Sequence, residues 1–209
     1  MLRYPKMPGP AGAQLGPCVA FEKLDGTNVF WEWTAGRWTS FGLRSGGYPW
    51  TPEGIGEFRA KHAPQAAAPD VFAEALADPL GERLRAMAPA GGVIAFAEFL
   101  GTGSFAGAHQ PGDEMQLVLF DVWLDGHGFL GPERFVELFG TLPVPRVLYR
   151  GKFSGKLTED VRTGKYGVAE GAVIKGGDGE TVWMAKVKTQ AYLDRLKASF
   201  GDQWEDYWE

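Results

Sequence analysis

Apolar residues alternate with polar ones in several short segments of the chain and follow a helical period in others. The alternation predicts strands at 18–22, 28–33 and 37–43, of which the last two form a hairpin around 34–36. Longer apolar runs and β-rich segments predict four more strands, at 93–100, 115–124, 171–175 and 181–188. Helical spacing and helix-start signals predict helices at 53–62, 70–77, 78–87, 132–139 and 190–200, with Asp70 as the cap of the second. The glycine-rich residues 44–47 predict a loop. These elements predict an α+β fold, with antiparallel β-sheets flanked by helices.

Four charged residues interrupt three of the predicted strands. Glu98 and Asp121 stand inside apolar runs, while Lys186 and Lys188 alternate with apolar neighbours. A buried charge is costly unless it is paired or used. Glu98 and Glu170 each lie where a strand meets a glycine, and carboxylates there suit a divalent metal such as Mg²⁺. Lys186 and Lys188 are two residues apart, so they share one face and suit a triphosphate; an exposed strand face is the plainer alternative.

The segment FEKLDGTN at 21–28 concentrates polar chemistry after a predicted strand. Its Asp-Gly pair predicts a sharp turn, because glycine accepts a positive φ, and this turn would gather Lys23, Asp25, Thr27 and Asn28 around one small volume. A lysine amine held near other cations loses its proton more easily and becomes a nucleophile. We therefore expect Lys186 and Lys188 to lower the pKa of Lys23 by like-charge repulsion. Short motifs match by chance, so a surface hairpin with a solvated lysine is the alternative for this segment alone.

Length and composition limit the classes that remain. The 209 residues suffice for one substantial core, and the net charge of −5 argues against a protein that coats nucleic acid. The single Cys18 permits no internal disulfide and, with only three His, argues against a structural zinc site. The sequence has no apolar run of membrane-spanning length and its N-terminus has no apolar signal core. We expect a cytoplasmic protein with no membrane partner.

Six motifs follow one another in a fixed order: KLDGTN, RSGG, FAEFLG, LFDVW, EGAVIK and KVK. This order resembles the covalent nucleotidyltransferase superfamily of polynucleotide ligases and mRNA capping enzymes, from about residue 20 to 188. Within it the chain is most similar to RNA ligases of the phage T4 RNA ligase 2 and trypanosome editing-ligase type, because Asn28 stands where DNA ligases usually carry Arg. The implied fold is the antiparallel nucleotidyltransferase core, described as ATP-grasp-like.

The resemblance implies a role for each matching residue. Lys23 matches the lysine that becomes adenylylated, and Glu22 matches a residue that reads the adenine amino edge. Glu98 matches a ribose-side glutamate and Glu170 one that organises the metal, so both are candidate metal ligands. The remaining matches are candidate nucleotide-binding residues: Asp25, Asn28, Arg44, Phe120, Lys175, Lys186 and Lys188. Lys186 and Lys188 also count as catalytic candidates because they would hold the phosphates, whereas Phe120 would stack on the base unless it is ordinary strand core.

The implied activity is ATP-dependent RNA ligation through a covalent lysyl-AMP, with ATP and Mg²⁺ or Mn²⁺ as cofactors and RNA ends or a nicked duplex as partners. The alternatives are a DNA ligase, an mRNA capping guanylyltransferase using GTP, and a nucleotide- or RNA-binding module without catalysis. Asn28 argues against the DNA ligase, and Glu22 with Asn28 argues against the capping enzyme.

We expect residues 1–209 to form a single nucleotidyltransferase domain, without the C-terminal OB-fold or helical accessory domain of relatives, because 21 residues follow Lys188. Such a core is expected to seal a pre-adenylylated RNA nick faster than a 5′-phosphate nick, unless a helper protein or a dimer supplies the missing surface.

A basic excess lies between Arg146 and Lys165, where only Glu159 and Asp160 are acidic. Lysine and arginine side chains that contact phosphates give salt-dependent binding to nucleic acid. We therefore expect Arg150, Lys152 and Lys156 to contact the nucleic-acid backbone. A solvated surface segment is the alternative, and charge pattern alone favours neither.

Overall fold

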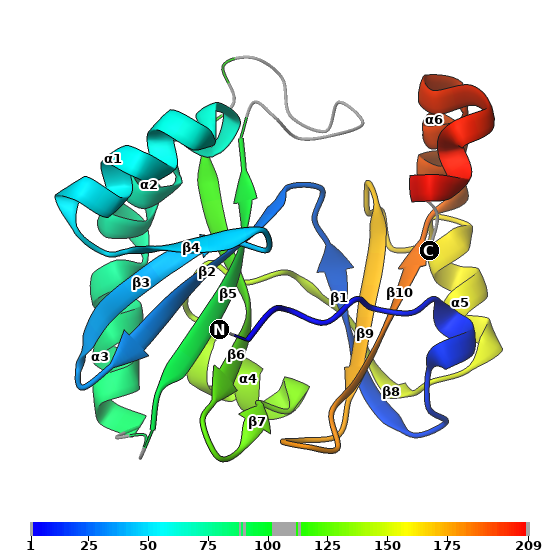
Figure 1. Cartoon of the computed structure of the whole chain (residues 1–209). Coiled ribbons are helices and arrows are strands. Elements are labelled where there is room, and N and C mark those ends of the chain that lie inside the picture. Colours follow the sequence, from blue (N-terminus) through cyan, green and yellow to red (C-terminus); the bar gives the residue numbers. More distant parts are fainter. Residues whose placement is uncertain (1, 88, 90, 102–111, 113, 208–209) are drawn as a thin grey trace.

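Two antiparallel sheets stand side by side in the computed structural model, which describes residues 2–87, 89, 91–101, 112 and 114–207 (Figure 1). The first sheet has the order β10-β9-β1-β8. Its strands are β1 (Pro17–Lys23), β8 (Val147–Lys152), β9 (Gly171–Gly176) and β10 (Trp183–Lys188). The second sheet has the order β4-β3-β2-β5-β6-β7. Its strands are β2 (Thr27–Thr34), β3 (Arg37–Leu43), β4 (Gly46–Pro49), β5 (Val93–Leu100), β6 (Gln116–Leu124) and β7 (Gly128–Phe129).

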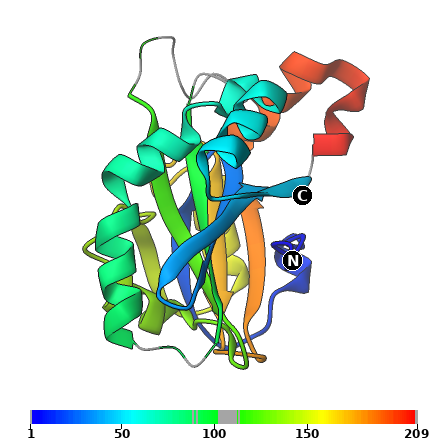
Figure 2. The same cartoon turned by 60° about the vertical axis from the view of Figure 1, so that its left-hand side comes forward.

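Helices cover the outer faces of both sheets, as Figures 1 and 2 show. The second sheet carries α1 (Pro52–Lys61), α2 (Ala68–Ala75) and α3 (Ala77–Met87). The first sheet carries α5 (Gly155–Arg162), and α6 (Gln190–Phe200) follows β10. Helix α4 (Pro132–Phe139) packs against β1 and α3. Short 3₁₀ turns are Pro10–Gly12, Ala63–Gln65 and Gly201–Tyr207. The predicted α+β class is confirmed.

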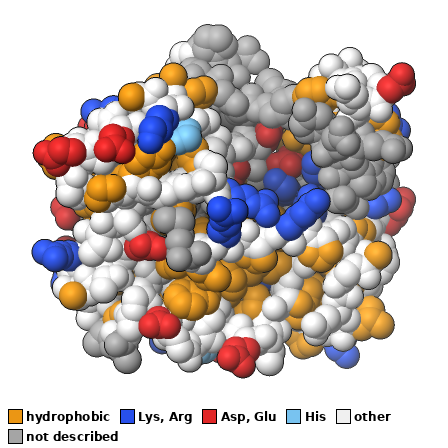
Figure 3. All heavy atoms as spheres, in the orientation of Figure 1, with side chains coloured by type: hydrophobic (Ala, Val, Ile, Leu, Met, Phe, Trp, Pro, Cys, Tyr) orange, Lys and Arg blue, Asp and Glu red, His pale blue; other side chains and the backbone are white. Residues whose placement is uncertain are grey.

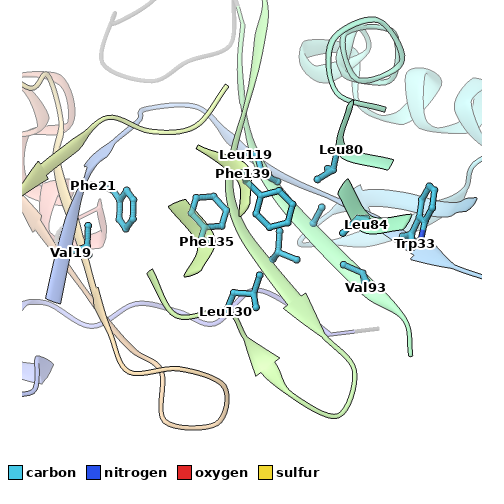
Figure 4. Packing of buried hydrophobic residues seen from close by; sticks show 12 residues of the cluster. Val19, Phe21, Trp33, Leu80, Leu84, Val93, Leu119, Leu130, Phe135 and Phe139 are labelled. Carbon is cyan, nitrogen blue, oxygen red and sulfur yellow. The ribbon is translucent and has the colours of Figure 1, made fainter. Parts of the chain in front are cut away.

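The central core joins the two sheets through α4 (Figure 4). Val19 and Phe21 point from β1 toward this core, and Phe135 and Phe139 of α4 pack there with Leu119 of β6. The opposite face of β1 packs against α5 through a separate cluster of small and branched residues. Because side chains alternate along a strand, Lys23 continues the face of Val19 and Phe21 and points between the sheets.

The sequence placed most elements correctly, and helices 132–139 and 190–200 have the predicted bounds. Two local predictions were wrong. Residues 44–47 were expected to be a loop, but Gly46 and Gly47 begin β4, where Gly42 of β3 leaves room for close pairing. Asp70 was expected to cap a helix, but α2 begins two residues earlier and Asp70 lies in its first turn. Within the described residues, no helix combines the length and apolar character that crossing a bilayer requires.

The residues before β1 run across the front of both sheets (Figure 1). Tyr4 is buried against Phe96 of β5, and its hydroxyl lies 3.1 Å from Sδ of Met184 in β10. Farther along, the carbonyl of Pro8 accepts a hydrogen bond from the backbone N–H of Lys186, at 2.9 Å. This N-terminal segment therefore contacts both sheets and forms one wall of the space between them.

Candidate active site

A pocket of about 260 Å³ opens between the two sheets. The first sheet supplies part of its lining from β1 and β9, the second supplies part from β2, β5 and β6, and the N-terminal segment completes it. The lining residues are Tyr4, Pro5, Met7, Phe21, Glu22, Lys23, Leu24, Gly26, Asn28, Arg44, Glu98, Phe120, Pro145, Val173 and Lys175. Figure 3 shows a hollow in this face, with acidic side chains inside it and Lys and Arg side chains along its rim.

Lys23 and Glu170 form the central ion pair of the site. The Nζ atom of Lys23 lies 2.8 Å from Oε1 and 2.9 Å from Oε2 of Glu170, and the glutamate is almost fully buried. Lys188 approaches the same carboxylate, with Nζ 3.9 Å from Oε1. Strand pairing explains the proximity, because both Lys23 and Lys188 are in register with Gly171, the residue after Glu170. One carboxylate thus faces two of the sequence-predicted lysines.

Burial alone would lower the pKa of the Lys23 ammonium, but the charges of Glu170, Glu98 and Asp25 outweigh burial and raise it. The expectation that Lys186 and Lys188 would lower this pKa is therefore wrong for the protein without its ligands. The sequence showed the lysine pair at 186 and 188, but only the fold brings the carboxylates of Glu170, Glu98 and Asp25 together around Lys23. The ammonium form of Lys23 is favoured until negative charge is neutralised or the proton is removed.

Glu98 lies below the Asp25–Gly26 turn and holds it in place. Its Oε1 atom accepts a hydrogen bond from the backbone N–H of Gly26 at 3.1 Å. A side chain at Gly26 would meet the carbonyl oxygen of Phe99 at 2.5 Å, so the turn needs glycine for space; its φ is not positive, contrary to the sequence-based argument. Burial, followed by the nearby Glu170 charge, raises the pKa of Glu98 to about 7 despite the opposing charge of Lys23.

Asp25 and Tyr192 join the turn to the start of α6. Burial, with the charge of Glu170, raises the pKa of Asp25 to about 6. The hydroxyl of Tyr192 lies 3.5 Å from Oδ1 of Asp25, and the Nζ atom of Lys188 lies 5.0 Å from the centre of the Tyr192 ring. Sequence reasoning missed Tyr192, since its only signal was an aromatic residue four positions after Lys188 on a predicted helix.

Glu22 lies at another edge of the pocket. Its Oε2 atom accepts a hydrogen bond from Nε of Arg146 at 3.2 Å. Arg146 in turn donates to the backbone carbonyl of Tyr166, also at 3.2 Å. Glu22 therefore keeps a fixed carboxylate at the pocket edge while one of its oxygens is already engaged.

Lys175 has a different environment from Lys23 and Lys188. Its Nζ atom donates to Oδ2 of Asp121 and to the carbonyl oxygen of Phe120, each at 2.8 Å, and the ion pair is buried. The same ammonium lies 5.7 Å from the centre of the Phe120 ring. Lys175 is thus held inside the protein at the wall formed by Phe120, rather than directed only at a ligand.

The remaining nucleotide-binding candidates lie at or beside this pocket. Asn28 of β2 and Arg44, which follows β3, line it directly. Lys186 lies on the same face of β10 as Lys188, because side chains alternate along a strand and the intervening Val187 packs on the opposite side with residues of α5. The fold therefore gathers residues that are separated by up to 166 positions, from Glu22 to Lys188.

The three nucleic-acid-binding candidates lie outside the pocket. Nε of Arg150 bonds to Glu133, and Nζ of Lys156 lies 3.1 Å from Asp160. Lys152 lines a separate cavity of about 580 Å³ at the other end of β1. Acidic residues from α4 and α5 thus offset part of the basic excess that the sequence pattern showed.

The carboxylates of Glu98 and Glu170 both act on the Lys23 ammonium, which places negative charge from two elements around one point. Among the described residues, no set of three or more His, Cys, Asp or Glu side chains forms a metal-binding cluster. Mg²⁺ needs no such cluster, because it commonly binds one or two carboxylates and completes its shell with water and substrate phosphates. The donor set fits a divalent cation that enters together with a phosphate ligand.

Comparison with known families gives one sequence match. The model of the RNA ligase family matches residues 16–190, which include every strand-borne candidate described above. A search of curated proteins finds no match.

Solved structures share the fold at low sequence identity. A protein from Aquifex aeolicus, provisionally described as an ATP-dependent DNA ligase, has a TM-score of 0.64 and 20% identity. The match covers 99% of this chain and 57% of the Aquifex protein. An archaeal ATP-dependent RNA ligase has a TM-score of 0.66 and 16% identity, and the match covers 96% of this chain and 52% of that ligase. A mutant RNA ligase from Naegleria gruberi, solved with ATP and Mn, has a TM-score of 0.64 and 14% identity. The match covers 94% of this chain and 58% of that ligase. The chain therefore spans between half and three fifths of the length of these structures.

Proposed function

The chain belongs to the RNA ligase family, and on that premise we propose that it is an ATP-dependent RNA ligase that works through a lysyl-AMP intermediate. The observation that carries the proposal is the position of Lys23, which lines the pocket between the sheets with Glu170 at 2.8 Å and Glu98 and Lys188 nearby. The similar Naegleria gruberi structure contains ATP and Mn, which supports the same pair of cofactors here.

In the first step, the unprotonated Nζ of Lys23 attacks the α-phosphorus of ATP. A nitrogen–phosphorus bond forms, the bond to the bridging oxygen breaks, and pyrophosphate leaves with the negative charge. Phosphoryl transfer depends mainly on positioning and charge neutralisation, which the Lys186 and Lys188 side chains would supply at the phosphates. The proton leaves Lys23 toward the carboxylates that already surround it, of which Glu170 is in direct contact.

In the second step, an oxygen of an RNA 5′-phosphate attacks the phosphorus of the lysyl-AMP. The nitrogen–phosphorus bond breaks, the amine returns to Lys23, and a pyrophosphate linkage joins AMP to the RNA end. In the third step, a 3′-hydroxyl attacks the 5′-phosphorus, a phosphodiester forms and AMP leaves. In each of the three steps negative charge develops on a phosphate group in the same pocket, so one set of cationic side chains can stabilise all three.

The pocket lining supports a purine at the Phe120 side. An aromatic face stacks on a base regardless of sequence, so selection between adenine and guanine must come from polar groups. Glu22 is proposed to accept a hydrogen bond from the adenine amino group, with Arg146 fixing the carboxylate. Asn28 and Arg44 line the same pocket and are proposed to contact the sugar and phosphates.

Glu98 and Glu170 are the proposed ligands of Mg²⁺ or Mn²⁺. When bound, the cation supplies neutralising charge at the phosphates. The raised pKa of Glu98, about 7, means that its carboxylate is not fully ionised at neutral pH before a cation arrives. Glu170 is held by Lys23 and Lys188, so cation binding would compete with these two ammonium groups for its oxygens.

Incubation of the purified protein with α-³²P-labelled ATP or GTP, followed by a denaturing gel, tests the proposal. We expect a covalent label from ATP that requires a divalent cation and is released by pyrophosphate. Label from GTP alone would instead indicate a capping enzyme, and reversible binding without label would indicate a non-catalytic module. Ligation assays on nicked duplexes with an RNA or a DNA strand at the 3′-hydroxyl side then separate RNA from DNA joining.

A further inference from the structure

Phe120 lies at a break in the strand register, and that break directs it toward the pocket. In the β5–β6 pairing, Phe96 is opposite Asp121 while Ala97 is opposite Leu119, so Phe120 is the extra residue of a β-bulge. Regular alternation would place Phe120 and Asp121 on opposite faces. Because the bulge interrupts alternation, both face the space between the sheets: Phe120 lines the pocket and Asp121 bonds to Lys175.

Tyr4 of the N-terminal segment holds this bulge from the front. Its hydroxyl donates a hydrogen bond to Oδ2 of Asp121 at 2.8 Å, and the contact is buried. Its ring meets the Phe120 ring edge-on, with centroids 5.1 Å apart and planes at 87°. Further edge contacts to Phe96 and Phe129 fix the tyrosine ring itself. Tyr4 also lines the pocket, as do its neighbour Pro5 and Met7.

Lys175 holds the same bulge from the opposite sheet. Its ammonium bonds both to the Asp121 carboxylate and to the backbone carbonyl of Phe120. Oδ2 of Asp121 therefore accepts from Tyr4 and from Lys175, which come from chain regions 171 residues apart. Burial raises the pKa of Asp121 and that of Tyr4. The buried Asp121 carboxylate is stabilised by both of its donors, Tyr4 and Lys175, and losing either one would leave it poorly paired.

We propose that Tyr4 is a positioning residue for nucleotide binding: acting through Asp121 and Lys175, it fixes the bulge that carries Phe120 and so sets the aromatic wall of the pocket. The inference rests on the proposed function, since the wall is assigned to the base of ATP. It also gives Lys175 a task that the sequence did not indicate, namely holding the wall rather than binding phosphate. Tyr4 touches no reacting atom, so its effect falls on nucleotide affinity and not on the chemical step.

Tyr4→Phe tests this inference because it removes the hydroxyl and keeps the ring. In single-turnover labelling, we expect the half-saturating ATP concentration to rise about three- to tenfold. This is the effect expected when the loss of one hydrogen bond is felt only in part at the nucleotide. The maximal labelling rate at saturating ATP should stay within about twofold, since the groups around Lys23 are untouched. Isothermal titration with α,β-methylene-ATP, which cannot transfer AMP, should show the same loss of affinity.

Tyr48→Phe is the matched control. The Tyr48 hydroxyl forms a hydrogen bond with His62 at the end of α1, and Tyr48 does not line the pocket. It should leave both the ATP dependence and the analogue affinity unchanged, whatever it does to the melting temperature. If Tyr4→Phe lowers only the melting temperature and leaves ATP dependence and analogue affinity as in the parent, Tyr4 is merely structural and the inference is overturned. A parent protein that neither binds the analogue nor takes up label would instead refute the proposed function.

Discussion

The ammonium of Lys23 lies against both oxygens of Glu170, 2.8 Å from Oε1 and 2.9 Å from Oε2. In this arrangement the proposed nucleophile is protonated and its lone pair is unavailable. The resting ion pair must loosen before Lys23 can attack phosphorus. Phosphates and a divalent cation entering the pocket would compete for the same groups, which ties activation of the amine to the arrival of its substrate.

Replacing the proposed nucleophile gives the first prediction. Lys23→Ala should abolish covalent labelling by ATP, because no other side chain can form the lysyl-AMP at this position. Peptide mass spectrometry of the parent should locate the added adenylate on Lys23. Lys61→Ala, an equivalent change at an exposed lysine of α1, should label as the parent does. Full labelling of Lys23→Ala would show that the assignment is wrong.

The rate of adenylylation should rise with pH. The pKa of Lys23 is raised by its carboxylate neighbours, so the fraction of free amine grows throughout the range from pH 6 to 9. Ionisation of Glu98 near pH 7 acts in the same direction, since a carboxylate binds a cation better than a neutral carboxyl does. Single-turnover labelling at fixed, saturating ATP and Mg²⁺ measures this. A rate that falls between pH 6 and 8 would contradict the role of the free amine.

Glu98→Gln should increase stability above neutral pH while impairing metal-dependent labelling. The pKa of Glu98 is about 7 in the folded protein against 4.5 as reference, so the folded state holds the proton more tightly. The parent therefore loses stability as pH rises from about 4.5 to 7, and Glu98→Gln, which can keep the Gly26 hydrogen bond, escapes that loss.

The gain in unfolding free energy for Glu98→Gln is expected to be about 1–3 kcal/mol at pH 8 and to vanish near pH 4. Thermal or urea unfolding at both pH values checks the sign. Glu74→Gln, at an exposed position of α2, is the control for loss of one negative charge. Equal stabilisation at pH 4 and 8 would show that proton linkage at Glu98 is not its cause.

Selection of ATP over GTP should depend on Glu22. A carboxylate accepts from the adenine amino group but repels the guanine carbonyl, and an unsatisfied buried group costs roughly 1–3 kcal/mol. Glu22→Gln can donate to that carbonyl through its amide, so the preference for ATP should shrink about tenfold or more. Labelling rates with each nucleotide at equal, subsaturating concentration give the ratio. An unchanged ratio, or equal use of both nucleotides by the parent, would remove Glu22 from base selection.

Binding of RNA should respond to the basic segment and to its acidic partners in opposite ways. Arg150, Lys152 and Lys156 replaced together by Ser should weaken RNA binding and flatten its salt dependence, because fewer counterions are released. Lysine adenylylation should be spared, since these residues lie outside the pocket.

Glu133→Gln combined with Asp160→Asn should strengthen RNA binding, because these carboxylates pair with Arg150 and with Lys156 and Lys165. Fluorescence anisotropy with a labelled nicked duplex at several salt concentrations measures both variants. Identical affinity and salt slope in the parent and both variants would place the RNA backbone on another surface.

Several features of this protein could be read from the sequence. Alternation placed β1 and the β2–β3 hairpin, a long apolar run placed β5, and helical spacing placed α4 and α6. These signals are local: side chains alternate every two residues in a strand, and a capping residue acts within one turn. The order of the six motifs also identified the family, which the match over residues 16–190 bears out.

Only the tertiary structure decided how charges pair within the site. Lys175 looked equivalent to Lys188 in the sequence, yet a strand register, a β-bulge at Phe120 and a residue near the N-terminus give it Asp121 as its partner. Likewise, the pKa of Lys23 is set by Glu98 and Glu170, which lie 75 and 147 positions away. Which charges meet depends on the register and closure of two sheets, and a local pattern carries no information about that. The sequence determined which groups the chain owns, and the packing of the two sheets determined which of them face one another.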